Sequence, residues 1–164
     1  MNKERYEKWM RYWKTHPEKT RAVLFLDTQL SISFVFAYMI LLFLTRGTTK
    51  FIPLLAVPAV AFLLLSLLRT LINSPRPSEV YGIHASAPYV KTNHSFPSRH
   101  AFSAFMIAFS AFYAGFFYLG VILLVFAALV ASLRVIIGLH FVADVSAGAL
   151  AALAAALIGY LLIF

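Results

Sequence analysis

The sequence predicts an all-α protein, a polytopic membrane bundle of five transmembrane helices preceded by an amphipathic helix at the bilayer interface. The 164 residues are 62% hydrophobic and 12% charged, with a mean hydropathy of +0.83, whereas soluble domains are close to half apolar. The apolar residues fall into long runs, which are separated by short polar turns and one long connection. The first 21 residues, by contrast, are highly charged. These three observations define the expected architecture.

Residues 1–21 carry seven Lys or Arg against three Glu. Within them Tyr6, Trp9, Met10 and Trp13 recur at positions i, i+3, i+4 and i+7. This spacing predicts a helix that lies in the interface, with its basic face toward phosphates and its aromatic face toward acyl chains. A solvated tail is the alternative. We therefore divide the chain into an interfacial helix, residues 1–21, and a membrane-embedded domain, residues 22–164.

The first predicted span is residues 22–45, which as a helix is about 36 Å long and can cross a bilayer. Asp27 and Gln29 lie near its start, where we expect them to reach the interface or pack against a neighbouring helix. Residues 46–50 form a short polar turn, and residues 51–72 form the second span, with a kink expected at Pro58.

The connection over residues 73–99 is polar and contains four prolines. Structureless loops of this length are usually functional or disordered, so we predict a cap over a site, with short helical turns inside it. Residues 100–119, 121–137 and 141–164 form the remaining spans. The last span is rich in small residues that permit close helix packing, which predicts a central position for it. These residues are Ala147, Gly148, Ala151, Ala152, Ala155 and Gly159.

Counting crossings places the end of the second span, the start of the third and the turn between the last two at one membrane surface, together with the amino terminus. Ionisable groups beside apolar spans are energetically costly, so a cluster of them indicates a functional site. The residues that gather at this surface are Arg69, Arg76, Ser98, Arg99, His100, Arg134, His140 and Asp144.

His140 and Asp144 are four residues apart, so they share one face if a helix begins near them. A carboxylate that holds one ring nitrogen leaves the other nitrogen free to act as a nucleophile or base. Arg134 adds a forked donor, which suits a phosphate. The sequence therefore indicates chemistry on a phosphate group.

Two further segments supply candidate anion contacts. Arg69 and Arg76 precede Pro77, although an arginine at the end of a span is usually an anchor that reaches toward the interface. Ser98 is a candidate N-cap, and the helix start that follows it offers free N–H groups to an anion. Capping alone would explain Ser98 but not His100.

The three segments together resemble the signature of the type 2 phosphatidic acid phosphatase (PAP2) superfamily. They read R-x6-R-P at 69–77, P-S-R-H at 97–100 and R-x5-H-x3-D at 134–144, where the family has K-x6-R-P, P-S-G-H and S-R-x5-H-x3-D. The resemblance implies that His140 attacks phosphorus to form a phosphohistidine and that Asp144 orients it. It implies that His100 protonates the leaving group and then activates water. The implied phosphate-binding residues are Arg69, Arg76, Ser98 and Arg134; no metal or other cofactor is implied.

The chain departs from this signature at three positions, where Arg69 replaces lysine, Arg99 replaces glycine and Leu133 replaces serine. We expect Arg99 to contact the headgroup or a second phosphate; the alternative is an ion pair with Glu79. His84 and His94 match no motif and are interpreted as loop histidines. The chain also has one expected span fewer than the six that are common in the family.

The resulting hypothesis is a bacterial membrane lipid phosphatase that acts without metal. Candidate substrates are undecaprenyl diphosphate, phosphatidylglycerol phosphate, phosphatidic acid and lipid A 1-phosphate. One alternative is a lipid phosphotransferase on the same scaffold. Another is a non-catalytic lipid-phosphate binder, which the two histidines and Asp144 argue against because binding needs only the cations. We do not expect nucleic acid as a partner, since dispersed arginines suit anionic headgroups better.

The location of the active face depends on which argument is followed. The positive-inside rule places the basic amino terminus, and with it the site, in the cytoplasm. The family resemblance favours the extracytoplasmic face of a bacterial plasma membrane. We favour the second location, because headgroup or substrate phosphates can hold the basic helix on that side.

Overall fold

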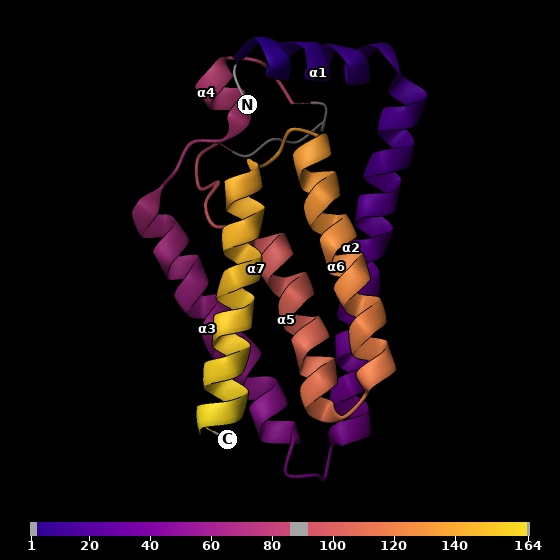
Figure 1. The fold of residues 1–164 in the computed structure, drawn as a ribbon, viewed down its shortest axis with the longest axis vertical. Coiled ribbons are helices and arrows are strands. Elements are labelled where there is room, and N and C mark those ends of the chain that lie inside the picture. The colour runs from indigo at the N-terminus through magenta and orange to yellow at the C-terminus, as the bar shows by residue number, and fades with distance from the viewer. Residues whose placement is uncertain (1–2, 86–91, 164) are drawn as a thin grey trace.

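The computed structural model describes residues 3–85 and 92–163, and within these residues all regular structure is helical (Figure 1). The elements in chain order are α1 (Lys3–Thr15), α2 (Pro17–Thr45), α3 (Phe51–Ile72), α4 (Pro77–Tyr81), α5 (Arg99–Ala114), α6 (Phe117–Ile136), α7 (Val142–Leu157) and a π-helical segment η1 (Ile158–Ile163). The all-helical fold class is therefore confirmed. The expected connection over residues 73–99 contains the short helix α4, while residues 86–91 within it lie outside the described residues.

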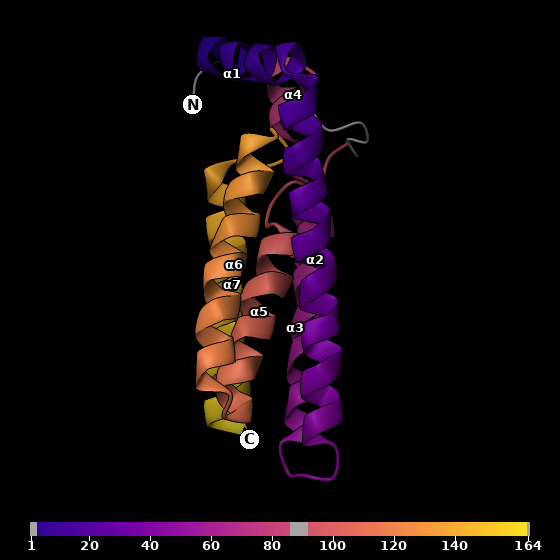
Figure 2. The same ribbon diagram turned by 90° about the vertical axis from the view of Figure 1, so that its right-hand side faces the viewer.

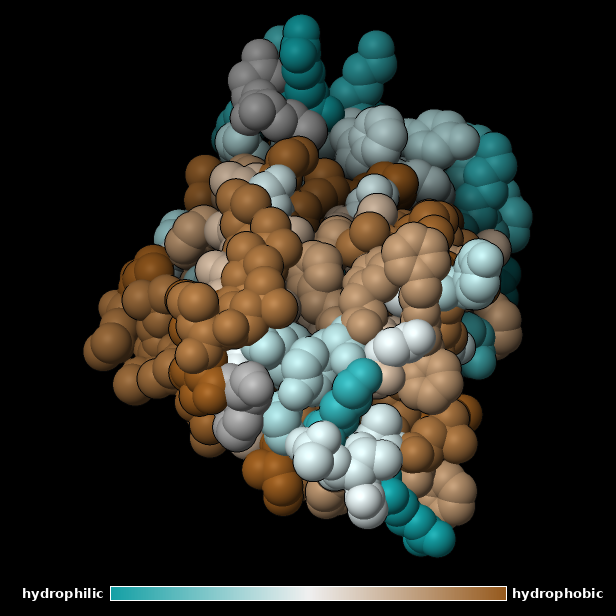
Figure 3. Space-filling model, turned by 60° about the horizontal axis from the view of Figure 1, so that its bottom comes forward, coloured by the Kyte–Doolittle hydropathy of each residue, from teal (hydrophilic) through white to brown (hydrophobic). Residues whose placement is uncertain are grey.

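Four stretches are long and apolar enough to cross a membrane, namely Pro17–Thr45, Phe51–Tyr81, Phe117–Ile136 and Val142–Ile163. Large apolar side chains on these helices are exposed, among them Phe36, Leu63, Val125 and Leu161. Figure 3 shows hydrophobic side chains over much of the surface and hydrophilic ones at its two ends, the near end with the turn between α2 and α3 and the far end with α1. The protein is thus a multi-pass membrane protein. α5, with 16 residues, is shorter than these four stretches.

The centre of the bundle is α5, which packs against α2, α3, α6 and α7 (Figures 1 and 2). The prediction that the last span is central is therefore wrong. The small residues of α7 serve its approach to α5 instead: a Cβ added at Gly148 would lie 2.5 Å from the carbonyl oxygen of Ser98 and 3.2 Å from the backbone nitrogen of Phe102. α5 itself presents Ala101, Ala104 and other fully buried alanines to its neighbours.

Several helix ends differ from the predicted ones. α2 begins at Pro17 rather than at residue 22, because proline suits the first turn of a helix and the charged residues that follow are exposed. α5 ends at Ala114 rather than at residue 119, because Gly115 adopts φ +97° and its N–H bonds back to the carbonyl oxygen of Phe112. As a result α6 begins at Phe117, four residues earlier than predicted.

Helix α1 lies across the end of the bundle, over the turn between α6 and α7 (Figures 1 and 2). Tyr6 and Met10 are fully buried. The Tyr6 hydroxyl donates to the carbonyl oxygen of Gly138 (3.2 Å), and the Trp9 indole N–H donates to that of Ile136 (2.7 Å). Part of the aromatic face of α1 therefore contacts the protein, where the sequence predicted contact with acyl chains. The tertiary contacts redirect these side chains, because the backbone carbonyls at the end of α6 need donors.

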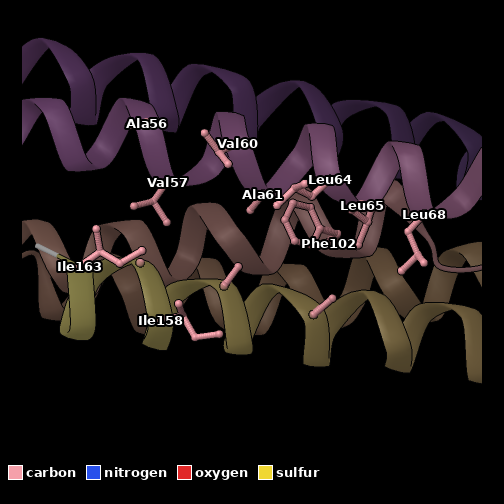
Figure 4. Close-up of a pocket in the computed structure, with 13 residues that line it drawn as sticks. Ala56, Val57, Val60, Ala61, Leu64, Leu65, Leu68, Phe102, Ile158 and Ile163 are labelled. Carbon is pink, nitrogen blue, oxygen red and sulfur yellow. The ribbon is translucent and has the colours of Figure 1, made fainter.

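An apolar groove of about 560 Å³ runs between α3 and the α7–η1 segment (Figure 4). Its walls include Val57, Leu64, Phe102 and Ile158. One end of the groove is lined by Leu68, the residue that precedes Arg69 in α3. The groove therefore runs from the apolar middle of the bundle to the end that carries the three motif segments at 69–77, 97–100 and 134–144.

Candidate active site

The three motif segments are bonded to one another at the end of the bundle where α1 lies. Arg69 Nη1, at the end of α3, donates to the carbonyl oxygen of Pro97 (3.0 Å). Arg76 Nη1 donates to the carbonyl oxygen of Leu139 (3.0 Å). The backbone N–H of Ser98 donates to the carbonyl oxygen of Asp144 (2.9 Å). Each segment thus contacts both of the others, so the arrangement at this end is held by main-chain oxygens as well as by helix packing.

The histidine nearest the centre of this arrangement is His140, in the turn between α6 and α7. Its Nδ1 lies 3.3 Å from Asp144 Oδ2, and both side chains are buried. Asp144 is at the third position of α7, and the same Oδ2 accepts the N–H of Phe141 (2.9 Å), which is the geometry of a helix cap. Because Asp144 engages Nδ1, the other ring nitrogen, Nε2, is the one that can act on a substrate.

Burial lowers the pKa of His140, although the bond to Asp144 acts in the opposite direction. The neutral imidazole is therefore favoured at neutral pH, which is the form that a nucleophile requires.

Ser95 completes this network and was not singled out from the sequence. Its hydroxyl donates to Asp144 Oδ2 (2.5 Å), lies 3.3 Å from His140 Nδ1 and is fully buried. Its N–H donates to the carbonyl oxygen of Ser74 (2.8 Å). Three groups thus surround a single carboxylate oxygen. Ser95 stands in the same short segment as Ser98, but its partner is 49 residues away on another helix, so no local spacing rule could reveal the contact.

A cationic pocket of about 240 Å³ lies next to this network. It is lined by Ser66, Arg69, Thr70, Arg76, Thr92, Asn93, His94 and Arg99, and no carboxylate is among these residues. Arg76 Nε and Ser66 Oγ are buried without a hydrogen-bond partner among the described residues. An arginine stays protonated at neutral pH. A pocket with three guanidinium groups and unsatisfied polar atoms is suited to an anion with several oxygens.

His100 lies in the first turn of α5, and Ser98 is the N-cap of that helix, as predicted. Together with Arg99 and Ser103, His100 lines a second hollow of about 440 Å³. Its imidazole is close enough to His140 and Arg69 for their charges to act on it. His100 and His140 therefore lie within electrostatic range of each other.

Arg134 has a partner that the sequence did not predict. Its Nε forms an ion pair with Asp27 Oδ1 at 2.9 Å, between α6 and α2. We expected Asp27 to reach the interface or pack against a neighbouring helix, and it does the latter. Its contact, however, is one of the candidate phosphate-binding residues.

The contacts in the loop before α5 concern two of the expectations, the possible ion pair of Arg99 with Glu79 and the roles of His84 and His94. Glu79 Oε2 accepts the backbone N–H groups of Arg76 and Asn93, both at 2.8 Å, so this carboxylate holds the loop together. No ion pair joins Glu79 to Arg99 within residues 3–85 and 92–163. His94 lines the cationic pocket and its Nδ1 lies 3.3 Å from the carbonyl oxygen of Arg69, so it is more than an incidental loop residue. His84 is exposed.

Across the part of the chain that the structure describes, no group of three or more His, Asp or Glu side chains forms a candidate metal site.

Comparison with known proteins gives two kinds of match. The sequence model of the PAP2 superfamily matches residues 50–164. The crystal structure of LpxE from Aquifex aeolicus is 28% identical, with a TM-score of 0.71, over 88% of this chain and 86% of that one. The crystal structure of a transmembrane PAP2 type phosphatidylglycerolphosphate phosphatase from Bacillus subtilis is 25% identical, with a TM-score of 0.65, over 86% of this chain and 73% of that one. No curated protein sequence matches the chain.

Proposed function

Because this chain belongs to the PAP2 superfamily, we propose that it is a membrane lipid phosphatase that hydrolyses a phosphomonoester or diphosphate headgroup without a metal ion. The observation that carries the proposal is the buried His140–Asp144 pair, 3.3 Å apart, beside a pocket lined by three arginines. A binding protein would need the arginines but not a histidine oriented by a carboxylate.

The proposed reaction has two steps. In the first, His140 Nε2 attacks phosphorus, the bond from phosphorus to the leaving oxygen breaks, and His100 donates a proton to that oxygen. In the second, His100 removes a proton from water, the water oxygen attacks phosphorus, and the bond between phosphorus and His140 breaks to release phosphate. Asp144 stabilises the positive charge that develops on the His140 ring.

The proposed phosphate-binding groups are Arg69, Arg76 and Arg134, with Ser98 and the N–H groups at the start of α5. Charge grows on the phosphoryl oxygens as the transition state forms, and fixed cations placed beforehand stabilise it without reorganisation. We assign Arg99 to the same pocket, where it adds a third guanidinium to those of Arg69 and Arg76.

The apolar groove supports a lipid as the substrate. Its end at Leu68 adjoins Arg69, so a headgroup in the cationic pocket leaves a hydrocarbon tail beside apolar walls. Candidate lipids are undecaprenyl diphosphate, phosphatidylglycerol phosphate, phosphatidic acid and lipid A 1-phosphate. The Bacillus subtilis neighbour is by its title a phosphatidylglycerolphosphate phosphatase.

For the topology we propose five crossings, by α2, α3, α5, α6 and α7, with residues 1–21 at the interface and residues 22–164 as the phosphatase domain. α5 is about 24 Å long, which is enough for a central helix whose ends are covered by loops. The protein would lie in a bacterial plasma membrane with its site on the extracytoplasmic face.

The test uses purified protein in detergent with EDTA present and a panel of the four lipids. We expect phosphate release from at least one lipid by the wild type, and loss of release in His140→Ala and His100→Ala. His84→Ala is the matched control, because this histidine is exposed in the loop outside the pocket, and it should retain activity. Release that persists in both active-site variants would refute the mechanism.

A further inference from the structure

Asp27 is a carboxylate in the first half of the apolar helix α2. It lies ten residues after the start of α2 at Pro17, about 15 Å along the helix, and only 5% of its surface is exposed. An ionised side chain at such a position is costly unless it has a partner, and it usually marks a functional site. α2 precedes residue 50, where the match to the PAP2 superfamily begins, so the family signature assigns Asp27 no role.

The partner of Asp27 is the guanidinium of Arg134. The ion pair uses Nε, at 2.9 Å, and the two side chains are 12% and 7% exposed. The contact is a close ion pair and not a directed hydrogen bond, because neither Nε nor Asp27 Oδ1 has a hydrogen-bond partner among the described residues. The attraction fixes the position of the guanidinium, and the planar fork then limits where the four N–H bonds on Nη1 and Nη2 can point. Among the residues that the structure describes, no hydrogen bond to Nη1 or Nη2 of Arg134 is present.

Arg134 is also tied to the proposed nucleophile through the main chain. Its carbonyl oxygen accepts the N–H of Leu139 (3.0 Å) and the N–H of His140 (3.3 Å). Its charge acts on His100 and on Arg76. The side chain that Asp27 holds is therefore within electrostatic range of two groups of the site, and its backbone supports the turn that carries His140.

We propose that Asp27 is a positioning residue of the phosphatase site: it holds Nε of Arg134 so that the two terminal nitrogens bind oxygens of the substrate's phosphoryl group. This inference rests on the proposed function. Tyr6 and Trp9 of α1 also hold this region, through their hydrogen bonds to Gly138 and Ile136. Together with the ion pair of Asp27, α1 and α2 therefore contact the end of α6 and the turn after it at three points.

A structural role is the competing explanation, in which the ion pair only joins α2 to α6. The two explanations differ in what happens when Arg134 is absent. If Asp27 acts through Arg134, its replacement has no further effect on catalysis once Arg134 is gone. If Asp27 only stabilises the bundle, catalysis per folded molecule should be the same with or without it.

The test is a double-mutant cycle of Asp27→Asn and Arg134→Ala. We expect Asp27→Asn to lower kcat/KM by about 10-fold, and Asp27→Ala by up to about 100-fold, since a small misplacement of a catalytic group can have that effect. In the Arg134→Ala background, Asp27→Asn should change kcat/KM by less than about twofold. Glu18→Gln, an exposed carboxylate on the same helix, should leave activity unchanged.

The cycle is repeated with the Kd for inorganic phosphate, measured by calorimetry, in place of kcat/KM. This second readout includes the variants whose turnover is too slow to measure. Melting in detergent establishes that each variant is folded, and Asp27→Asn carries the test if Asp27→Ala does not fold. Wild-type activity in Asp27→Asn, or an equal loss with and without Arg134, would overturn the proposal. If the wild type releases no phosphate from any lipid, the proposed function fails, and the phosphate affinities still decide the role of Asp27.

Discussion

Replacing Ser95 by alanine tests whether the network around Asp144 serves catalysis. The substitution removes one donor from Asp144 Oδ2 and leaves the contacts to His140 Nδ1 and to the N–H of Phe141. A hydrogen bond to a charged group contributes about 1.5 to 3 kcal/mol. If that difference appears in the barrier, kcat falls by about 10- to 100-fold, because about 1.4 kcal/mol corresponds to a factor of ten.

The pH profile separates this effect from simple destabilisation. The Ser95 hydroxyl stabilises the Asp144 carboxylate, so its removal leaves the carboxylate a stronger partner for a protonated His140 ring. The pKa of His140 should therefore rise in Ser95→Ala. Since His140 must be neutral to attack, the acid limb of kcat/KM should move to higher pH than in the wild type.

Ser110→Ala is the matched control for the loss of a buried serine hydroxyl. Ser110 is also fully buried. It lies in the second half of α5, away from the candidate active site, and its hydroxyl bonds to the carbonyl oxygen of Met106 and to the hydroxyl of Tyr160 (both 2.8 Å). This variant should lower the melting temperature without moving the pH profile. A Ser95→Ala enzyme with kcat within twofold of wild type and an unchanged acid limb would refute the role of Ser95.

Three further outcomes are expected. Burial lowers the pKa of His140 from its ordinary 6.5, so the acid limb of kcat/KM should lie below pH 6.5, and a limb centred above pH 7 would contradict the geometry. Arg99→Gly removes one of three guanidinium groups from the pocket. As a result, kcat/KM should fall about tenfold more for dioleoylglycerol diphosphate than for dioleoyl phosphatidic acid. Equal losses for the two lipids would show that Arg99 does not bind a second phosphate. Tyr6→Phe removes the bond to Gly138 and should lower the free energy of unfolding by about 0.5–1.5 kcal/mol, whereas Tyr12→Phe, on the exposed face of α1, should change melting little.

The positions of the helices, and the gathering of the three motif segments at one end of the bundle, were predictable because both depend on local sequence patterns. Apolar runs of sufficient length identify spans, and the parity of crossings decides which ends share a surface. The contact between His140 and Asp144 follows from a four-residue spacing at a helix start, and the cap at Ser98 follows from the residue type before α5.

Contacts between distant segments were not predictable in the same way. The bond from Ser95 to Asp144 and the ion pair of Asp27 with Arg134 join different helices, and no periodicity in one segment identifies a partner in another. The central helix was predicted wrongly for a related reason. Small residues show that a helix can be approached closely, but they do not show which of two helices the others surround.

The close contact at Gly148 connects membrane packing to the reaction. The oxygen that a Cβ at this position would meet belongs to the backbone of Ser98, which unlike a flexible side chain cannot rotate away. Even Gly148→Ala should therefore displace the start of α5 and the N–H groups that we propose bind the phosphate. A saturation library scored for turnover should accept glycine alone at 148, although this position is buried between α7 and α5 and belongs to no catalytic motif.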